Sequence, residues 1–436
     1  MRKVLNYINN NVLVKVASLN SVSVIVKIIA GFLTSKFIAL FVGAEGMALV
    51  GNLRNFVGSI QSFSILGLYK GVVKYIAEFK NNAVELTKVL STVFYLGFIA
   101  TMFVSILVYF KADYINDLIF KEFNDYAYVI RIFAIALPFY ALNMLAFSIM
   151  NGFAKYKYLI VFNIFGQILS AVITILLIWL EQLDGALISV VVAESLIFLI
   201  TLVGIANRRN FLPLLKASYF NLGYVKKLSS YSGMALFSAF LLPIIAILIR
   251  TYIIDNVGLV EAGFWEAMNR ISKYYLLFVS SLLTLYILPR FAEIDNIKDF
   301  RKEVFSFYKT IIPVFGSGLV VIYFLRHFII SLVFTEEFQP VEELFIWQLL
   351  GDFVKVLSIV IAYQFLAKRM FWHYIITEAF SVVTLYFTSI LLIDEFGVVG
   401  ANMAHFVTYI LHFGIILLIF SHSLFGVLPE ESKYDN

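Results

Sequence analysis

Four basic residues stand deep inside long apolar segments of this 436-residue chain, where a positive charge needs a specific reason. They are Lys27, Arg54, Arg270 and Lys273. A cation at the centre of a membrane helix costs about 2.5–3.5 kcal/mol on insertion scales, so each one needs water or an anion nearby. Arginine binds pairs of phosphate oxygens, and lysine acts as a compact point charge. The four residues therefore predict a site for a phosphate or another multivalent anion.

Pairing within the protein is the alternative for some of these charges. Glu266 precedes Arg270 by four residues, and Asp352 precedes Lys355 by three, so each pair can share one helix face. A structural ion pair and a role in binding are both open for them. Lys27, Arg54 and Lys273 have no such local partner, which favours a role in binding the substrate. Cations nearer to the predicted helix ends are expected to reach the lipid headgroups instead, namely Lys36, Lys70, Lys74, Arg131 and Arg250.

Acids and histidines inside the apolar segments raise the question of whether an ion gradient drives transport. Glu194 and Glu378 can carry protons that drive transport, although a hydrogen-bonded neutral acid explains them equally well. We expect His405 and His412 to be packed or interfacial rather than a relay. Paired carboxylates, metal-ligand clusters, glycine-rich phosphate loops and nucleophilic triads do not stand out. The sequence thus predicts neither a catalytic residue nor a metal nor a cofactor, and leaves coupling to protons or Na⁺ open.

The composition places these charges in a membrane protein. Hydrophobic residues make up 61% of the chain and charged residues 14%, which is too much apolar surface for a water-soluble core. Apolar segments long enough to cross about 30 Å of hydrocarbon recur, without the alternation of a β-barrel. We expect an all-α integral membrane fold with twelve transmembrane helices, at 17–42, 47–76, 88–110, 126–151, 156–180, 185–206, 229–253, 262–289, 305–325, 341–367, 371–393 and 398–424.

The loops between these segments alternate in charge. Basic residues gather in every second loop, whereas the opposite loops are acidic and hold only Lys111, Lys121 and Arg326 as cations. Basic side chains resist translocation, so both termini are predicted to be cytoplasmic. The net charge of +5 follows from this distribution rather than from one basic patch. Binding of nucleic acid is therefore not expected.

An internal repeat divides the chain. The segment 109–122 recurs at 323–336, an offset of 214, with six identical positions. The dipeptides Gly185-Ala186 and Gly400-Ala401 recur in the same way at the start of the sixth and twelfth segments. We therefore expect two parallel six-helix repeats that form two lobes around a central cavity, an arrangement common in transporters. The expected divisions are a lobe at 1–206, a cytoplasmic linker at 207–228 and a lobe at 229–436.

Three stretches carry a resemblance to a known family. Residues 347–356 (WQLLGDFVKV), 286–290 (YILPR) and 74–77 (KYIA) resemble the Wzx-type O-antigen and enterobacterial common antigen flippases of the multidrug/oligosaccharidyl-lipid/polysaccharide exporter superfamily. The resemblance runs along nearly the whole chain. It implies that an undecaprenyl-pyrophosphate-linked oligosaccharide moves from the cytoplasmic to the periplasmic leaflet of a bacterial inner membrane by alternating access. It also implies polysaccharide polymerase and chain-length regulator proteins as partners.

Two other functions compete with this interpretation. A multidrug exporter of the same superfamily would be expected to place acids in its cavity, whereas this chain offers mostly bases. A membrane-embedded glycosyltransferase or polymerase would need a reaction site, usually on a sizeable loop at the membrane surface. The longest predicted outer loops have only about 15 residues. We therefore expect a transporter and not an enzyme.

Overall fold

The computed structural model describes residues 12–120, 126–153, 155–206 and 216–426. These residues are almost entirely helical and contain no strand. Nine of their helices are long and apolar enough to cross a membrane. The expected all-α membrane fold is therefore confirmed. The chain forms two compact units, residues 1–244 and 245–436, and the division falls within one helix, α9.

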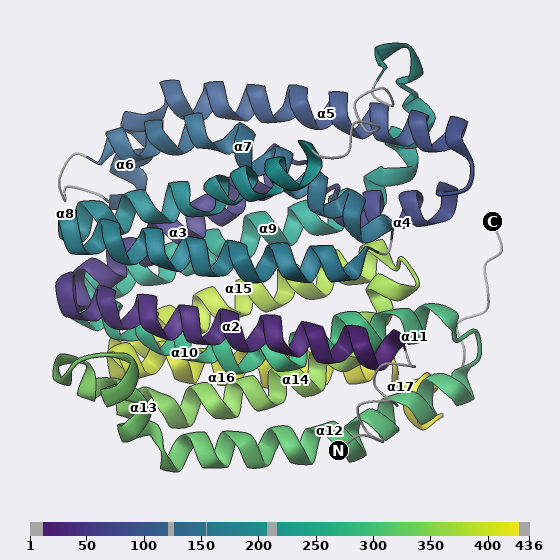
Figure 1. Cartoon of the computed structure of the whole chain (residues 1–436). Helices are drawn as coiled ribbons and strands as arrows, with labels where there is room; N and C mark the ends of the chain where they lie inside the picture. Colours follow the sequence, from purple (N-terminus) through teal and green to yellow (C-terminus); the bar gives the residue numbers. More distant parts are fainter. Residues whose placement is uncertain (1–11, 121–125, 154, 207–215, 427–436) are drawn as a thin grey trace, which may run out of the picture. The chain divides into compact units, whose positions relative to one another are not determined.

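The first unit is built around long helices that pack side by side. Within it, α7 packs against α5 and α8, and α8 packs against α2 (Figure 1). Its elements are α2 (Val12–Phe41), α3 (Gly43–Ser64), α4 (Tyr69–Phe79), α5 (Ala83–Phe110), α6 (Ala112–Phe120), α7 (Ala127–Gly152), α8 (Tyr156–Ala206), η2 (Ala217–Tyr219) and the part of α9 (Leu222–Asn256) up to Ile244, the rest of which belongs to the second unit.

Helix α8 contains two of the expected spans. At Gln182 the backbone leaves the helical region (φ 46°, ψ −114°) and the chain turns back on itself. A Cβ on Gly166 would lie 2.9 Å from the side chain of Ile197, so the two arms are in close contact. The spans predicted at 156–180 and 185–206 are thus two helices of a hairpin, although α8 counts once among the nine.

The second expected span, 47–76, is not one helix. It is broken between α3 and α4, where Leu66 and Gly67 have positive φ angles of 53° and 60°. An L-residue with a side chain rarely adopts this conformation, while glycine adopts it freely. The prediction of an uninterrupted helix was wrong, because Gly67 lets the chain turn there.

The second unit contains the remaining spans. Within it, α14 packs against α10, α12 and α16, and α15 packs against α16 (Figure 1). Its elements are α10 (Leu259–Leu282), the π-helical segment η3 (Leu283–Ile287), α11 (Leu288–Glu293), α12 (Ile297–Phe324), α13 (Arg326–Val333), the 3₁₀ segment η4 (Glu336–Leu344), α14 (Phe345–Ala367), α15 (Phe371–Phe396), α16 (Val398–Ile419) and α17 (Ser421–Phe425). Each of the twelve expected spans is thus mainly helical in the described chain, and the second is divided between α3 and α4.

The same local structures recur in both units, which confirms the repeat. The long helices α5 and α12 both begin at an asparagine cap, since Asn82 Oδ1 accepts the Glu85 N–H at 3.2 Å and Asn296 Oδ1 accepts the Asp299 N–H at 2.7 Å. The two caps are 214 residues apart. A short helix then follows each of them, α6 after α5 and α13 after α12.

The described part of the linker is docked on α5. The Lys216 N–H donates to Ser91 Oγ at 3.1 Å, and the Asn221 N–H donates to Thr92 Oγ1 at 3.0 Å. The Tyr224 hydroxyl donates to Glu85. Burial, together with the hydrogen bond to this carboxylate, raises the pKa of Tyr224 above its usual value. The rest of the linker, residues 207–215, lies outside the described residues.

Candidate functional site

The polar face of α10 begins with a buried charge cluster. Glu266 Oε2 lies 2.5 Å from Arg250 Nη2, and its Oε1 lies 3.2 Å from Arg270 Nε. All three side chains are at most 2% exposed. The Arg250 guanidinium also stands over the ring of Trp265, with 5.2 Å between its Cζ and the ring centroid. The expectation that Arg250 reaches the headgroups was wrong, because Glu266 holds it inside the unit.

Farther along the same helix face, several polar side chains are exposed. Lys273, Ser280 and Thr284 follow at spacings of seven and four residues and are all exposed. The π-helical segment η3 begins at Leu283, and such segments are frequent at functional sites. Lys273 therefore presents its charge outside the buried cluster of Glu266, Arg250 and Arg270.

Asp352 on α14 lies at the centre of a second buried network. Its Oδ2 accepts hydrogen bonds from Ser272 Oγ (2.5 Å), Tyr275 Oη (2.5 Å) and Gln348 Nε2 (3.1 Å). Its Oδ1 lies 3.0 Å from His405 Nε2 on α16. Lys355 Nζ stands 5.1 Å from the centroid of the Tyr409 ring, while the direct contacts of Asp352 come from these other residues. The network thus links α10, α14 and α16.

In the first unit, Lys27 lies on α2 and is exposed. Large apolar residues exposed along one stripe of this helix identify its lipid side, namely Val22, Ile25, Ile29, Leu33 and Leu40. At 3.6 residues per turn, Lys27 lies roughly 140° around the helix from that stripe. The side chain is therefore exposed on a different face from the one built for lipid.

Arg54 on α3 is half-buried. One turn later a Cβ added to Gly58 would meet nothing within 4 Å. Ser62 donates from its hydroxyl to the Gly58 carbonyl at 3.1 Å. Gln61, on the same helix, donates from its Nε2 to Glu194 Oε2 at 3.1 Å. Glu194, which the sequence suggested as a carrier of protons, therefore contacts α3, and its side chain is exposed.

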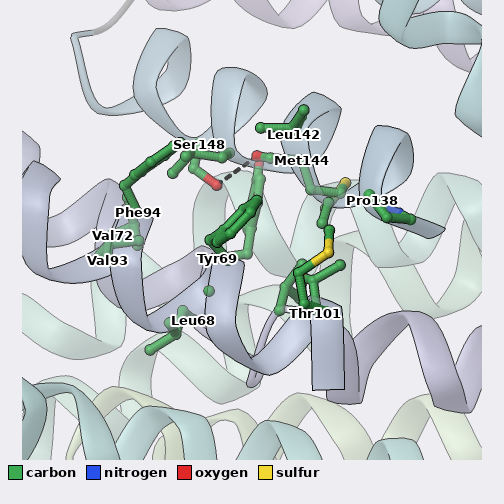
Figure 2. A pocket seen from close by; sticks show the side chains of 16 residues that line it. Leu68, Tyr69, Val72, Val93, Phe94, Thr101, Pro138, Leu142, Met144 and Ser148 are labelled. Atoms are coloured by element: carbon green, nitrogen blue, oxygen red, sulfur yellow. Dashed lines mark hydrogen bonds between the residues drawn. The ribbon is translucent and has the colours of Figure 1, made fainter. Parts of the chain in front are cut away.

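A cavity adjoins the break between α3 and α4. It holds about 70 Å³, and Figure 2 shows the side chains of α4, α5 and α7 that surround it. The three hydroxyls in its wall all have hydrogen-bond partners in the protein. Thr101 donates to the Ser64 carbonyl and Ser148 to the Met144 carbonyl, each at 2.8 Å, and Tyr69 Oη accepts from Asn151 Nδ2 at 3.2 Å. The cavity offers little to hold a sugar, but it leaves space beside the broken helix. The labelled lining residues are Leu68, Tyr69, Val72, Val93, Phe94, Thr101, Pro138, Leu142, Met144 and Ser148.

Sequence reasoning missed several members of these networks. Ser272, Tyr275 and Gln348 were not singled out, and His405 was expected to be merely packed or interfacial. The spacing of Gln348 and Asp352, at i and i+4 on one segment, and of Asn402, His405 and Tyr409 on another, places each set on one helix face. These two stripes of polar residues, each within an apolar segment, could have indicated the buried network from the sequence.

Known proteins resemble the chain over most of its length. Residues 13–295 match the profile of a family described as "Polysaccharide biosynthesis protein". The lipid III flippase of Escherichia coli (strain K12) is 28% identical over 412 residues, which cover 94% of this chain and 98% of that protein. A putative O-antigen transporter of Shigella flexneri is 22% identical over 272 residues, 62% of this chain and 64% of its own length.

Solved structures share the fold. The lipid II flippase MurJ in an inward closed conformation has a TM-score of 0.71 at 15% identity, covering 94% of this chain and 87% of its own. An inward-facing multidrug resistance MATE family transporter of the MOP superfamily has a TM-score of 0.70 at 14% identity, covering 92% of this chain and 98% of its own. At these identities the likeness concerns the fold alone.

Proposed function

Because the chain belongs to the polysaccharide biosynthesis protein family, we propose that it is a flippase for an undecaprenyl-pyrophosphate-linked oligosaccharide. The observation that carries the proposal is that two lysines are exposed, Lys27 on a helix that is long and apolar enough to cross a membrane and Lys273 on the polar face of α10. A pyrophosphate is the part of such a lipid that needs cations on its way across the bilayer. The near full-length similarity to the lipid III flippase agrees with this substrate class.

The proposed contacts to the pyrophosphate are Lys27, Arg54 and Lys273. Arg270 was predicted as a fourth contact, but its guanidinium lies against Glu266 in the buried cluster. We assign Arg270 and Glu266 to the support of α10, which carries Lys273. The sugar chain would travel with the pyrophosphate, while the polyprenyl tail stays in lipid.

The proposed location is the bacterial inner membrane, with both termini in the cytoplasm. The distribution of basic residues supports this orientation, because loops rich in lysine and arginine stay on the cytoplasmic side. Transport then runs from the cytoplasmic to the periplasmic leaflet by alternating access. A polymerase and a chain-length regulator would act on the product.

A deletion strain tests the proposal. Loss of the gene should cause the lipid-linked oligosaccharide to accumulate on the cytoplasmic face with its sugar chain complete, and the wild-type gene should reverse this. An accumulated glycan that is unfinished would contradict transport and favour a glycosyltransferase. Normal export of the polysaccharide in the deletion strain would contradict both functions.

A further inference from the structure

We propose that the short helices α6 and α13 lie in the membrane interface and embed one apolar face each in the outer leaflet, on the side away from the basic loops. They fall in the segments 111–125 and 326–340, which separate expected spans and read as acidic loops. The proposal goes beyond the flippase function, because it names a lipid surface as the partner of two helices and holds for any membrane function of the chain.

Each short helix exposes two large apolar side chains one turn apart. On α6, Tyr114 is 69% exposed and Leu118 is 61% exposed, and on α13 Phe328 is 60% exposed and Leu332 is 55% exposed. Positions four apart lie about 40° apart around a helix, so each pair forms one narrow face. Contiguous exposed apolar surface marks a contact with a membrane or a protein.

Each apolar face comes directly after a surface that suits lipid. Phe110 at the end of α5 is 76% exposed, and Phe324 at the end of α12 is 75% exposed. Tyr114 and Phe328 follow these residues by four positions. Both long helices are long and apolar enough to cross a membrane, so their exposed apolar side chains suit hydrocarbon. The face of each short helix thus begins where a surface suited to lipid ends.

An elbow between the long and the short helix changes the direction of the chain. Lys111 has φ −100° and ψ 15°, and Leu325 has φ −90° and ψ 6°, so both lie outside the α-helical region. In each case the N–H of this residue still donates to the carbonyl four positions earlier, at 3.0 and 2.9 Å. The chain then continues as α6 or α13 at the end of the long helix (Figure 1). The short helix therefore leaves the axis of the membrane-spanning helix.

A polar flank runs beside each apolar face. Asp113 and Asp117 lie roughly 80–120° from the middle of the apolar face of α6, and His327 and Ser331 lie at the same angles on α13. All four side chains are exposed. An exposed surface that is divided lengthwise into an apolar and a polar strip fits the boundary between hydrocarbon and water. A protein partner could cover either strip, whereas a lipid–water boundary requires both.

The polar flank is tied to another element of its own unit. On α6, both carboxylate oxygens of Asp113 accept hydrogen bonds from Arg131 Nη2 on α7, at 2.7 and 2.8 Å. On α13, His327 Nδ1 lies 2.7 Å from Glu342 Oε1 on η4. Helix α6 also packs against α3 and α7, and α13 packs against α12 and η4. These contacts hold the opposite side of each helix, so its apolar face stays turned outward.

The arrangement recurs in both units. An offset of 214 residues relates these pairs: Lys111 and Leu325, Asp113 and His327, Tyr114 and Phe328, Leu118 and Leu332. The elbow, the apolar face and the polar flank are therefore equivalent in the two repeats. An exposed apolar pair at equivalent places indicates a common surrounding, and lipid is the surrounding that two units of a membrane protein share.

Spin labelling of the full-length protein tests the proposal. The chain contains no cysteine, so one cysteine can be introduced and labelled with a nitroxide without other changes. Tyr114→Cys and Phe328→Cys are labelled and reconstituted in vesicles of phosphatidylethanolamine and phosphatidylglycerol. Collisions with oxygen, which concentrates in lipid, and with a water-soluble nickel chelate then give the depth of each label. Both labels should lie roughly 5–10 Å inside the headgroup boundary, shielded from nickel. Asp117→Cys and Ser331→Cys are the matched controls and should be open to nickel.

Two results would overturn the proposal. In the first, nickel reaches the labels at 114 and 328 as readily as the controls. In the second, these labels are shielded from both reagents and show spin–spin broadening that disappears on dilution with unlabelled protein, which indicates a second copy of the chain on these faces. Leu118→Cys and Leu332→Cys repeat the measurement one turn along and decide it if a first variant does not fold.

A transport assay in the same vesicles keeps the two proposals apart. It follows the flipping of a polyprenyl-pyrophosphate oligosaccharide that carries a dithionite-sensitive fluorophore on its sugar. Labels embedded in lipid, in a protein that moves no such oligosaccharide, would support the interfacial helices and contradict the flippase. Transport by a protein whose labels at 114 and 328 lie in water would support the flippase and contradict the interfacial helices.

Discussion

Gly400 lies directly against the carbonyl oxygen of Leu392, so close that a Cβ on the glycine would stand 2.0 Å from that oxygen. The contact closes the hairpin between α15 and α16, where Gly397 supplies a positive φ of 58°. The first unit has the same contact in α8, where a Cβ on Gly185 would stand 1.9 Å from the Leu177 oxygen. Both residues of the second pair lie 215 positions earlier, so the repeat preserves the hairpin in detail.

The hairpin contact should make Gly400 intolerant of any side chain. Gly400→Ala forces the two helices apart and is expected to cost about 1–3 kcal/mol, the usual range for overpacking. Gly414→Ala on the same helix is the control, because its Cβ meets nothing within 4 Å, and it should be neutral or stabilising. Thermal unfolding of the two purified variants in detergent measures the difference, and equal midpoints would refute the contact.

The break between α3 and α4 should depend on Gly67. Gly67→Ala places a side chain at φ +60° and within 3.0 Å of the Ala235 Cβ, so a loss of about 1–2 kcal/mol is expected. Gly97→Ala changes a glycine that lines the adjoining cavity and has open space around it, and should not destabilise the protein. The same unfolding assay applies. A stable Gly67→Ala variant would mean that the break does not need glycine.

The buried cluster should depend on the charge of Glu266. Glu266→Gln leaves Arg250 and Arg270 enclosed without their shared carboxylate, which is expected to cost about 3–5 kcal/mol. The matched control is Glu293→Gln, since Glu293 pairs with Arg290 at 3.6 Å on the surface and should change stability little. Folded yield and unfolding temperature report the result. Equal stability of the two variants would exclude a structural role for the cluster.

The docked linker should lose stability at alkaline pH. Tyr224→Phe removes the hydrogen bond to Glu85 and is expected to cost about 1 kcal/mol. Because folding raises the pKa of Tyr224 above its usual value of 10.0, this contribution is complete below pH 10 and falls as pH rises towards the folded pKa. Unfolding of both proteins between pH 8 and 11 should show the difference shrinking. Tyr219→Phe, at an exposed tyrosine, is the control.

Much of this fold could be predicted because a long apolar segment crosses a bilayer as a helix, which satisfies its own backbone hydrogen bonds. The alternation of charge between successive loops then indicates how many segments cross. The break at Leu66 and Gly67 was missed because the segment around it stays apolar on both sides. The contacts within the candidate site were harder to predict, because spacing in the sequence reveals only those ion pairs whose two residues lie on the same helix. Glu266 and Arg270 could be paired in this way, whereas the contacts of Glu266 with Arg250 and of Asp352 with His405 join different helices.

The proposed substrate contacts should matter for transport and not for folding. Lys27→Ala and Lys273→Ala remove exposed charges, so unfolding temperatures should stay unchanged. A charge-assisted hydrogen bond contributes about 1.5–3 kcal/mol, so each variant should flip lipid about tenfold more slowly or worse. Lys298→Ala, an exposed lysine near the start of α12, should keep the wild-type rate. Wild-type rates in both variants would remove these lysines from the site.

The central claim is tested most directly by the flipping rate of the labelled polyprenyl-pyrophosphate oligosaccharide in liposomes that contain the purified wild-type protein. Without any gradient, dithionite should reach only about half of the label in protein-free vesicles. With the protein present, the protected half should become accessible as lipid moves outward. Protection that persists at the protein-free level, with folded protein in the membrane, would contradict the account.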